Sequence, residues 1–524
     1  MMTKFDFRLM AIPAVYGVVL VMLQFAATPF WLWTNIDPSY FYLFNGLEIA
    51  LGQPPADFYH PGTTTQMIAG LVIRAMHPFA GHDALVDLTL SRPESVLHVI
   101  STVNALLIVA AMTWAGHQAK RAWGAVSVPV LLIQATPFLS TVNLLNAYPV
   151  KPEATIIALG MVMVGLLCRG LATTPDGKGS FGLGALAASL VMTKLHAVTM
   201  GVIPVFFLKR AGQRVAYVLG GLFGLGVFIL VIAPNLGTML TYFSGVATHT
   251  GAYGQGKTGL LPDHYVWQIF KQMRRPILSA PMVLGLAVLW RRRRAFTAED
   301  LPKARLLAGI ILAQFLHLAI VAKNPISYYL VPAFCTMGLA IALTLDLARP
   351  LVRIDGRKWT LALRGVCVLL ILTQSGSILD AFKNRAREKR TSDAVDMTPF
   401  AACTKVYFDF ASNPAFAMGL GNWMGGYRFS AWMEAHMPAD TYIWIPILGR
   451  PQQWGPDQIE VADLVAKAPC TAFRGAWGQQ MWDEIGRQAP TVPINACTNG
   501  DEWLLTTGIG CEGAFPGRNS KAVK

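Results

Sequence analysis

Two acidic residues stand out in the sequence because each lies at the end of a long apolar run. Asp37 follows the first run, which covers about residues 9–33, and Glu153 begins another run directly after Pro152. A carboxylate beside a bilayer is desolvated, which raises its basicity and suits it to accept a proton from a hydroxyl. The alternative for Asp37 is a helix cap before Pro38, and for Glu153 an interaction with the helix N-terminus. Both interpretations stay open for each residue.

Isolated basic residues form a second group, in short segments that are otherwise poor in charge. Lys194 and His196 lie between two apolar runs, and Lys323 separates another two. Arg274 and Arg275 directly precede a further run. Such cations suit an anionic lipid headgroup, although side chains that only anchor helix ends at the interface would give the same pattern.

These residues need a scaffold, and the composition indicates a membrane-embedded one. The 524 residues are 54% hydrophobic and only 14% charged, with a mean hydropathy of +0.44. Average soluble proteins contain about 25% charged residues. The apolar content excludes a disordered chain, and the length excludes a small disulfide-rich secreted scaffold. The sequence therefore predicts a polytopic α-helical membrane protein.

About eleven apolar segments are long enough, or nearly so, to cross a bilayer. The first is taken as an uncleaved anchor, because its apolar region is unusually long for a signal peptide. The segments at 180–193 and 195–208 are short for full spans. The predicted spans cover about residues 9–33, 98–116, 124–141, 154–169, 180–193, 195–208, 215–234, 277–290, 306–322, 328–346 and 359–378.

When consecutive spans are given opposite directions, most of the basic residues fall on one side of the membrane. Clusters such as Lys120 with Arg121, and the run from Arg291 to Arg294, fall on the side of the N-terminus. The intervening short loops hold single cations. This asymmetry places the N-terminus in the cytoplasm and explains most of the +14 net charge, so nucleic acid is not expected as a partner. We expect a bacterial inner-membrane protein whose C-terminus is periplasmic.

The division of the chain follows from this topology. Residues 1–378 are predicted to form the membrane domain, with outer loops at 34–97 and 235–276. Amphipathic stretches at about 40–51 and 63–77 suit helices lying in the interface. Residues 379–524 carry many tryptophans between Gly and Pro turns and are predicted to form a small periplasmic α+β domain.

The cysteines support an outer location for this tail. Cys403, Cys470, Cys497 and Cys511 all lie after residue 379. An even number confined to one segment suggests two disulfides in an oxidising compartment. Three pairings are possible, and the short separation favours Cys497 with Cys511, which leaves Cys403 with Cys470.

In chain order, the positions above resemble the polyprenyl-phosphate-sugar-dependent glycosyltransferases of the GT-C superfamily. The nearest branch is the bacterial one that includes protein O-mannosyltransferases and lipid A aminoarabinose transferases. The resemblance covers about residues 9–346. It is carried by Asp37 after the first span, Tyr59-His60-Pro61-Gly62, Pro152-Glu153, Thr193-Lys194, and Lys323 to Tyr329 leading into Leu330-Val331-Pro332.

The resemblance implies a reaction and a set of roles. Asp37 would act as general base for an acceptor hydroxyl, with inversion at the anomeric carbon. Glu153 would position the acceptor or a divalent metal. The cations would hold the donor phosphate: Lys194, His196, Lys323, Arg274 and Arg275. The substrate pocket would be lined by His60, Tyr40, Tyr59, Tyr328 and Tyr329.

Two departures from the family pattern bear on the metal. Asp37 precedes Pro38 where many mannosyltransferases have Asp-Glu, and His60-Pro61-Gly62-Thr63 stands where His-Pro-Pro-Leu is usual. A divalent metal is therefore possible but not assigned. The expected partners are a polyprenyl-phosphate sugar donor and a lipid, polysaccharide or protein acceptor.

Two other functions compete with transfer. A flippase or transporter of lipid-linked sugars would place charges near the bilayer midplane and would show repeat symmetry, whereas the charges here gather at one face. A non-enzymatic envelope assembly factor would use the tail to bind its partners.

Overall fold

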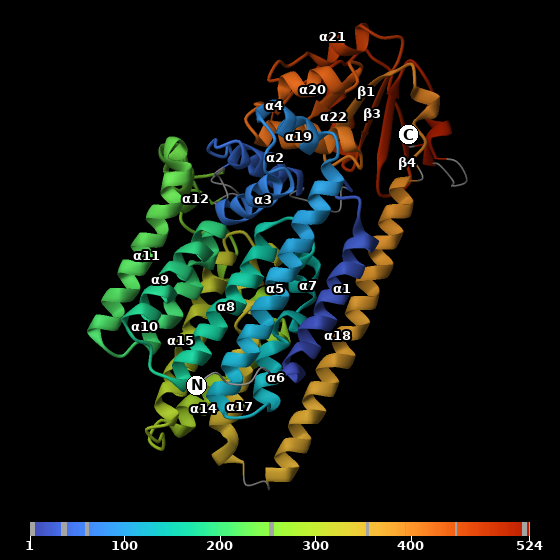
Figure 1. Ribbon diagram of the computed structural model, residues 1–524. Helices are drawn as coiled ribbons and strands as arrows, with labels where there is room; N and C mark the ends of the chain where they lie inside the picture. The colour runs from blue at the N-terminus through green and yellow to red at the C-terminus, as the bar shows by residue number, and fades with distance from the viewer. Residues whose placement is uncertain are drawn as a thin grey trace. The chain divides into compact units, whose positions relative to one another are not determined.

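The computed structural model describes most of the chain as helix, with one sheet near the C-terminus (Figure 1). The described residues are 6–32, 39–57, 62–250, 256–352, 356–393, 395–445, 448–515 and 521–522. The chain divides into two compact units. Unit 1 comprises Met1–Leu23, Phe58–Thr65 and Ser101–Leu379, and unit 2 comprises Gln24–Asp57, Gln66–Ile100 and Asp380–Lys524.

Unit 1 is built of helices. Its longer elements, some of which continue into unit 2, are α1 (Ala11–Ala27), α5 (Pro93–Trp123), α6 (Val128–Gln134), α7 (Thr141–Ala147), α8 (Pro152–Ala172), α9 (Gly177–Thr193), α10 (Val202–Phe207), α11 (Ala211–Ile232), α12 (Leu236–Thr248), α13 (Tyr265–Met273), α14 (Pro276–Arg292), α15 (Asp300–Val321), α16 (Val331–Phe334), α17 (Met337–Ala348) and α18 (Gly356–Asp393). Short 3₁₀ helices are η1 (Phe7–Met10), η2 (Thr136–Leu139), η3 (Leu195–Gly201), η4 (Ala233–Asn235), η6 (Ser327–Leu330) and η7 (Arg349–Leu351).

Several of these helices have the length and composition of membrane spans. Within the described residues, five qualify: Phe7–Ala27, Pro93–Trp123, Pro152–Ala172, Ala211–Thr248 and Asp300–Val321. A sixth is possible if Ser327–Cys335 and Met337–Leu351, which meet at a 44° bend, form one broken span. Apolar helices of this length are those of a membrane protein. The remaining spans of the predicted eleven stay predictions.

The segment predicted as one span over 124–141 is instead broken. Helix α6 ends at Gln134, and η2 follows with Pro137 near its start before α7 begins at Thr141. A proline lacks the amide proton that an α-helix needs in its interior, so the apolar run cannot continue as one helix. The next predicted break, at Lys194 between α9 and η3, is present.

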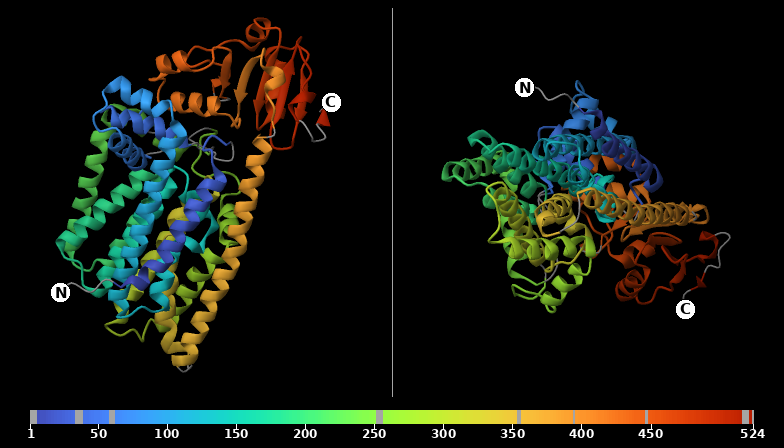
Figure 2. Two further views of the ribbon diagram at one scale, coloured as in Figure 1. Left: turned by 45° about the vertical axis from the view of Figure 1, so that its right-hand side comes forward. Right: turned by 90° about the horizontal axis from the view of Figure 1, so that it is seen from below.

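Helices α9 and α11 pack closely along much of their length and lie side by side in every view (Figures 1 and 2). Glycines allow this approach. A Cβ atom on Gly184 would lie 1.9 Å from the carbonyl oxygen of Tyr217, and one on Gly220 would lie 2.0 Å from that of Phe181. Small residues at such contacts bring helix backbones together, as is typical in membranes.

Basic residues predicted on the N-terminal side of the membrane have acidic partners. Lys120 at the end of α5 lies 2.8 Å from the carboxylate of Asp6, near the N-terminus. Arg292 at the end of α14 lies 2.8 Å from Asp300, at the start of α15. The first pair joins the end of α5 to the residue that precedes η1, and the second joins two consecutive helices.

Unit 2 contains helices from the first predicted outer loop and the whole C-terminal sheet. Its helices are α2 (Ser39–Ala50), α3 (Thr63–Met76, which begins in unit 1), α4 (His82–Leu90), α19 (Pro414–Met424), α20 (Ser430–His436), α21 (Val461–Ala466) and α22 (Gly478–Gln488), with the 3₁₀ helices η8 (Thr398–Phe400) and η10 (Glu512–Ala514). The predicted helices near 40–51 and 63–77 are thus present.

Helix α2 is not the amphipathic interfacial helix that we expected. Nearly all its side chains are buried, including the carboxyl-bearing Glu48. It packs on α19, where Gly421 lies against the ring of Phe44. The apolar residues of this stretch are therefore buried within the protein on several sides of the helix. From the sequence alone, such a helix cannot be told from one with an apolar face towards the membrane.

The sheet has six strands in the order β2-β1-β3-β5-β4-β6. The strands are β1 (Thr404–Phe408), β2 (Thr441–Trp444), β3 (Thr471–Gly475), β4 (Asn495–Thr498), β5 (Trp503–Thr507) and β6 (Lys521–Ala522). Strands β2, β1 and β3 are parallel, and β5, β4 and β6 continue antiparallel. The small C-terminal sheet was predicted, but its parallel half, joined by helices, is closer to an α/β than to an α+β arrangement.

Buried apolar side chains hold the helices of unit 2 against this sheet. Phe408, Phe473 and Leu505 come from three adjacent strands, and Met481 and Ile485 come from the apolar face of α22. All are nearly inaccessible to solvent. The core fixes the register of the strands, because a shift by one residue would turn these side chains to the other face.

The tail contains two disulfides, Cys403–Cys470 and Cys497–Cys511, which is the pairing favoured from the sequence. Their sulfur atoms lie in a separate small core with Phe400, Leu504 and Phe515. The remaining described cysteines, Cys168 and Cys335, are buried thiols in unit 1.

Candidate functional site

The centre of the candidate site is a buried ion pair between Glu153 and Lys194. Pro152 occupies the first position of α8, where its missing amide proton is harmless, and this places Glu153 in the first turn. Lys194 adopts an extended backbone between α9 and η3. The two side chains are 2% and 5% exposed. Each of these two buried charges compensates the other, because either charge buried without its partner would strongly destabilise the folded state.

Two tyrosines complete the surroundings of Lys194. Its ammonium nitrogen lies 4.6 Å from the ring centroid of Tyr328 and 4.7 Å from that of Tyr329. The two rings, on η6, are nearly perpendicular at 84°. Lys151 also approaches Tyr328, with its nitrogen 5.9 Å from the centroid. The electron-rich faces of the rings attract the ammonium group and fix its direction.

A pair of histidines lies behind Tyr329. The ring of His196 is 5.0 Å from the Tyr329 ring and 5.5 Å from the ring of His317. Nε2 of His317 lies 2.8 Å from the carbonyl oxygen of Tyr329, and Nδ1 lies 2.9 Å from the hydroxyl of Thr199. Since a carbonyl oxygen only accepts, Nε2 of His317 carries a proton. His317 therefore holds the backbone of Tyr329 in place.

Lys323 reaches the site from the loop after α15. Its ammonium group donates to the carbonyl oxygens of Val246 and Ala247, at 2.5 and 2.8 Å, in the last turn of α12. Cations favour this end of a helix, where carbonyl groups lack partners. Burial lowers the pKa of Lys323. The contact ties the loop to α12.

These residues line one cavity of about 470 Å³. Lys194, His196, Lys323 and Tyr329 contribute its polar wall. The remaining wall is largely apolar and includes Leu195, Val198, Phe243, Val246, Leu261 and Ile320. A cavity with ammonium groups at one part and an apolar wall elsewhere is complementary to a lipid phosphate, whose head is anionic and whose chain is apolar.

The structure thus brings together six of the predicted site residues and leaves others apart. The six are Glu153, Lys194, His196, Lys323, Tyr328 and Tyr329, of which Lys194, His196, Lys323 and Tyr329 line the cavity. Glu153 does not line the cavity but contacts it through Lys194. Arg274 packs over the ring of Trp267 at 4.9 Å, and Arg275 caps α14; neither lines the cavity.

The other predicted residues lie elsewhere in the chain. Tyr40 belongs to unit 2, where its hydroxyl donates to Glu94 at 2.9 Å. The predicted base Asp37 and the pocket residues Tyr59 and His60 lie outside the described residues.

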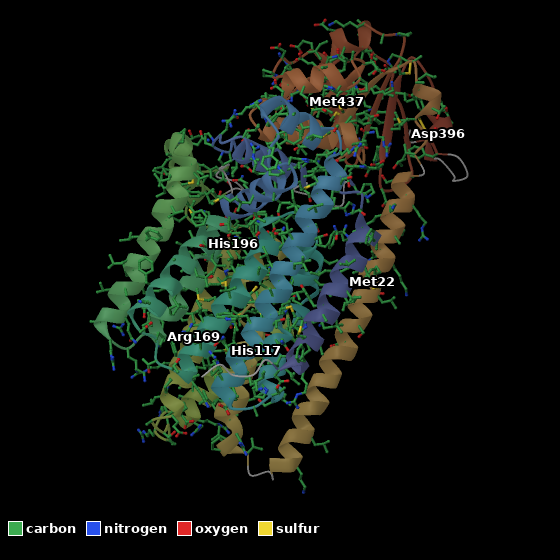
Figure 3. The ribbon with its side chains drawn as sticks, viewed as in Figure 1. Met22, His117, Arg169, His196, Asp396 and Met437 are labelled. Atoms are coloured by element: carbon green, nitrogen blue, oxygen red, sulfur yellow. A yellow bond between two sulfur atoms is a disulfide. The ribbon has the colours of Figure 1, made fainter. Side chains whose placement is uncertain are left out.

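Figure 3 locates His196 within unit 1 relative to the predicted cytoplasmic end of the helices. His117 and Arg169 lie towards the end at which the chain begins, and His196 lies further along the helices from it. Arg169 is in the last turn of α8, whereas Glu153 is in its first turn. Glu153 of the site and the basic residue Arg169 therefore lie at opposite ends of α8.

Three site residues were missed from the sequence. Tyr265 lines the cavity and donates to the carbonyl oxygen of Ala319 at 2.6 Å. Tyr242 lines it from α12. His317 supports Tyr329 from within α15. Only His317 carried a signal, because an ionisable side chain inside an apolar helix is a functional candidate by default.

The residues of the cavity do not fit a divalent metal. Lysine and tyrosine side chains are poor partners for such ions, which prefer carboxylate and carbonyl oxygens. Among the residues that the structure describes, no group of three or more His, Cys, Asp or Glu side chains lies close enough to hold a metal ion. The cations instead suit an anion directly.

Comparison with known proteins gives a distant structural likeness. No family model matches the chain. No curated protein is significantly similar in sequence. Among solved structures, the crystal structure of ArnT from Cupriavidus metallidurans bound to undecaprenyl phosphate is similar over 95% of this chain and 98% of that chain, with 11% identity and a TM-score of 0.47. A likeness this distant assigns neither residues nor activity.

Proposed function

We propose that the protein is a membrane glycosyltransferase that moves a sugar from a polyprenyl-phosphate donor to an acceptor hydroxyl. The proposal rests on the ammonium group of Lys194, which is held in one position by its neighbours. It is fixed by Glu153 and two tyrosine rings at the wall of a largely apolar cavity. The chemistry of that wall suits a phosphate attached to a long apolar chain.

The cations have a defined task in such a reaction. When the bond between the anomeric carbon and the phosphate oxygen breaks, the electron pair stays on the polyprenyl phosphate, and negative charge develops there. Positively charged groups that are already in place stabilise this charge without reorganisation. Lys194 and Lys323 line the cavity, as do His196 and Tyr329.

Asp37 is the proposed general base. It would take the proton of the acceptor hydroxyl as the oxygen forms a bond to the anomeric carbon from the face opposite the phosphate, which inverts that centre. General-base catalysis contributes about 10²–10⁴-fold to such steps. Glu153 acts as a positioning residue, because its carboxylate is committed to Lys194. No step is assigned to a metal.

The proposal includes a location. We place the protein in a bacterial inner membrane, with the site at the periplasmic face and with unit 2 outside. The contact of Lys120 with Asp6 puts the basic end of α5 beside the first described residues of the chain. The disulfides of the tail support an oxidising compartment.

The test measures binding and transfer separately with the full chain in nanodiscs. Binding is measured with undecaprenyl phosphate by native mass spectrometry. Transfer is measured with polyprenyl-phosphate esters of radiolabelled hexoses and of aminoarabinose, against lipid and polysaccharide extracts. Asp37→Asn should retain binding and lower the transfer rate about 100-fold or more. Lys194→Ala should weaken binding.

Lys271→Ala is the matched control, because Lys271 is an exposed cation on α13 that does not line the cavity. It should leave binding and transfer unchanged. Full transfer by Asp37→Asn would exclude Asp37 as the base. Binding of undecaprenyl phosphate that is equal in the native chain and in Lys194→Ala would contradict the role of the cavity.

A further inference from the structure

The C-terminal sheet has a point, at the carboxyl ends of its parallel strands, from which the connections of neighbouring strands leave towards opposite sides. This end of the sheet is called its edge below. From β1 the chain passes through α19 and α20 to β2, which lies on one side of β1. From β2 it passes through α21 to β3, which lies on the other side of β1, and from there it continues to β4 and β5. In open sheets with parallel strands, ligands bind beside the carboxyl ends of strands at such a divergence. Here that point lies between the ends of β1 and β3.

The backbone at the end of β1 adopts a sparsely populated conformation. Asp409 and Phe410 have φ angles of 33° and 58°, in the left-handed region that non-glycine residues rarely adopt. The amide of Ala476, just after β3, donates to the carbonyl oxygen of Asp409 at 3.1 Å. The ring of Phe410 meets that of Trp477 edge to face, with 5.4 Å between centroids. The two strand ends are therefore joined by specific contacts.

A hollow of about 350 Å³ lies at the same edge. It is lined by Ala476, Trp477, Gly478, Gln479, Gln480 and Trp503. Trp503 begins β5 opposite Gly475, the last residue of β3. The indole of Trp503 lies directly against Gly478, where any Cβ atom would be only 2.1 Å from the ring. Glycine at this position is thus what lets the indole form the wall.

The chemistry of this hollow is neutral. Its lining has two indoles and the amides of Gln479 and Gln480, with no charged side chain. Trp477 is 47% exposed, so a large apolar ring face is open to solvent. An indole face packs well against the C–H face of a sugar ring, and amide groups can donate to and accept from its hydroxyls. A phosphate or carboxylate would find no cation here.

We propose that this edge of the sheet is a binding site for an uncharged saccharide, with one sugar ring stacked on Trp477 and its hydroxyls at the side-chain amides of Gln479 and Gln480. The site lies wholly within unit 2 and does not depend on the transfer reaction proposed above. It gives the C-terminal unit a function of its own, which is to hold a glycan.

The experiment uses the full chain in a zwitterionic, sugar-free detergent, because glucoside and maltoside detergents carry the same chemistry as the ligand. The probes are methyl α-glucopyranoside, methyl α-mannopyranoside, N-acetylglucosamine and maltotriose. Saturation-transfer NMR should show ring C–H contacts with at least one of them. Trp477→Ala should raise the dissociation constant at least about tenfold.

The matched control is Trp432→Ala. Trp432 is a partly exposed indole of the same unit, on α20, and does not line the hollow. It should bind the saccharide as the native chain does. Circular dichroism of the variants verifies that the sheet is intact.

The proposal is overturned if none of the probes binds, if Trp477→Ala binds as tightly as the native chain, or if sodium sulfate competes with the saccharide at equal concentration. The last result would identify an anion site at the start of α22. Because these readouts involve no transfer, they can fail independently of the proposed glycosyltransferase.

Discussion

The cavity of unit 1 and the hollow of unit 2 are both lined by aromatic side chains, but the rings have different tasks. In unit 1 the rings of Tyr328 and Tyr329 face an ammonium group that is already present, that of Lys194. In unit 2 the indoles of Trp477 and Trp503 border a hollow without any charged side chain. The first arrangement prepares a cation for an anion, whereas the second leaves ring faces open for a neutral ligand.

The buried carboxylates of the two regions differ in the same way. Glu153 has Lys194 as its partner. Asp409 has no partner within the described residues, and burial raises its pKa to about 6. Burial alone therefore does not define a site. What distinguishes the regions is whether the protein itself supplies a compensating charge for the buried carboxylate.

The largest effect is expected from breaking the ion pair. Glu153→Gln leaves Lys194 buried without its carboxylate, which should destabilise unit 1 by about 3–5 kcal/mol. The double variant Glu153→Leu with Lys194→Met should recover much of this stability, because a well-packed apolar pair can replace a buried ion pair. It should not recover transfer. The measurements are thermal unfolding in detergent and the transfer assay.

A native melting temperature for Glu153→Gln would show that the pair contributes little. Recovery of transfer in the double variant would show that the charge of Lys194 is not needed, which would remove the contrast between the two regions.

The next effect concerns Asp409. Burial raises the pKa of its carboxyl from the ordinary value of 3.8 to about 6 in the folded chain. The folded state therefore binds the proton more tightly, so the stabilisation by protonation is complete below about pH 4 and is lost as the pH rises through 6. Two pKa units correspond to about 1–3 kcal/mol. Asp409→Asn should remove this loss and stabilise the sheet at pH 8.

Hydrogen exchange of peptides from β1 and β3, compared between the native chain and the variant at the same pH, measures this difference. Equal protection of the two proteins at pH 8 would show that the carboxylate finds a partner in solution.

A smaller effect is expected from Lys323→Ala. The residue lines the cavity but is also tied to the carbonyl oxygens of Val246 and Ala247. We expect about a tenfold rise in the KM for the donor with little change in kcat, because the phosphate loses one of its cations before and during the reaction. Lys323→Arg should retain part of the affinity. An unchanged KM would restrict the phosphate contacts to Lys194 and its neighbours.

The smallest effect is expected from Gly478→Ala. The added methyl group must displace the indole of Trp503. This should lower saccharide affinity about fivefold and leave transfer unchanged. Gly486→Ala is the control, since Gly486 lies in the same helix and a Cβ atom added there would have no neighbour within 4 Å. A loss of transfer in Gly478→Ala would link the two regions functionally.

Local patterns in the sequence predicted the apolar helices and the ends of several of them. The run after Pro152 forms α8, and the break at Lys194 separates α9 from η3. These features depend on hydropathy and on the backbone chemistry of proline, which act within one segment. The prediction of one span around Pro137 was wrong because it rested on hydropathy and left out the effect of that proline.

The site was only partly predictable because its contacts join distant segments. Glu153 and Lys194 lie 41 residues apart, and Tyr329 comes from a still later helix. Residue type marked them as candidates, but the meeting of Glu153 with Lys194 depends on the packing of α8 on α9. Arg274 had the same type and environment in sequence, yet it packs on Trp267 instead.

No pattern in the sequence predicted the hollow of unit 2 beside Trp477 and Trp503. Strand order depends on pairing between segments that are far apart, and Trp477 and Trp503 meet only because β3 and β5 are neighbours. The many tryptophans of the tail indicated a folded domain and nothing about which of them would remain exposed.

The disulfide between Cys403 and Cys470 has a consequence for the biogenesis of the protein. It connects the residues that precede β1 and β3, and closes a loop with a sequence separation of 67. A crosslink of that size is worth about 4 kcal/mol in the chain-entropy model. A newly made tail that has not yet met an oxidant lacks this constraint on its two central strands. In the periplasmic location proposed above, maturation of the sheet would follow export, and cells deficient in thiol oxidation should accumulate a protease-sensitive tail on an otherwise inserted protein.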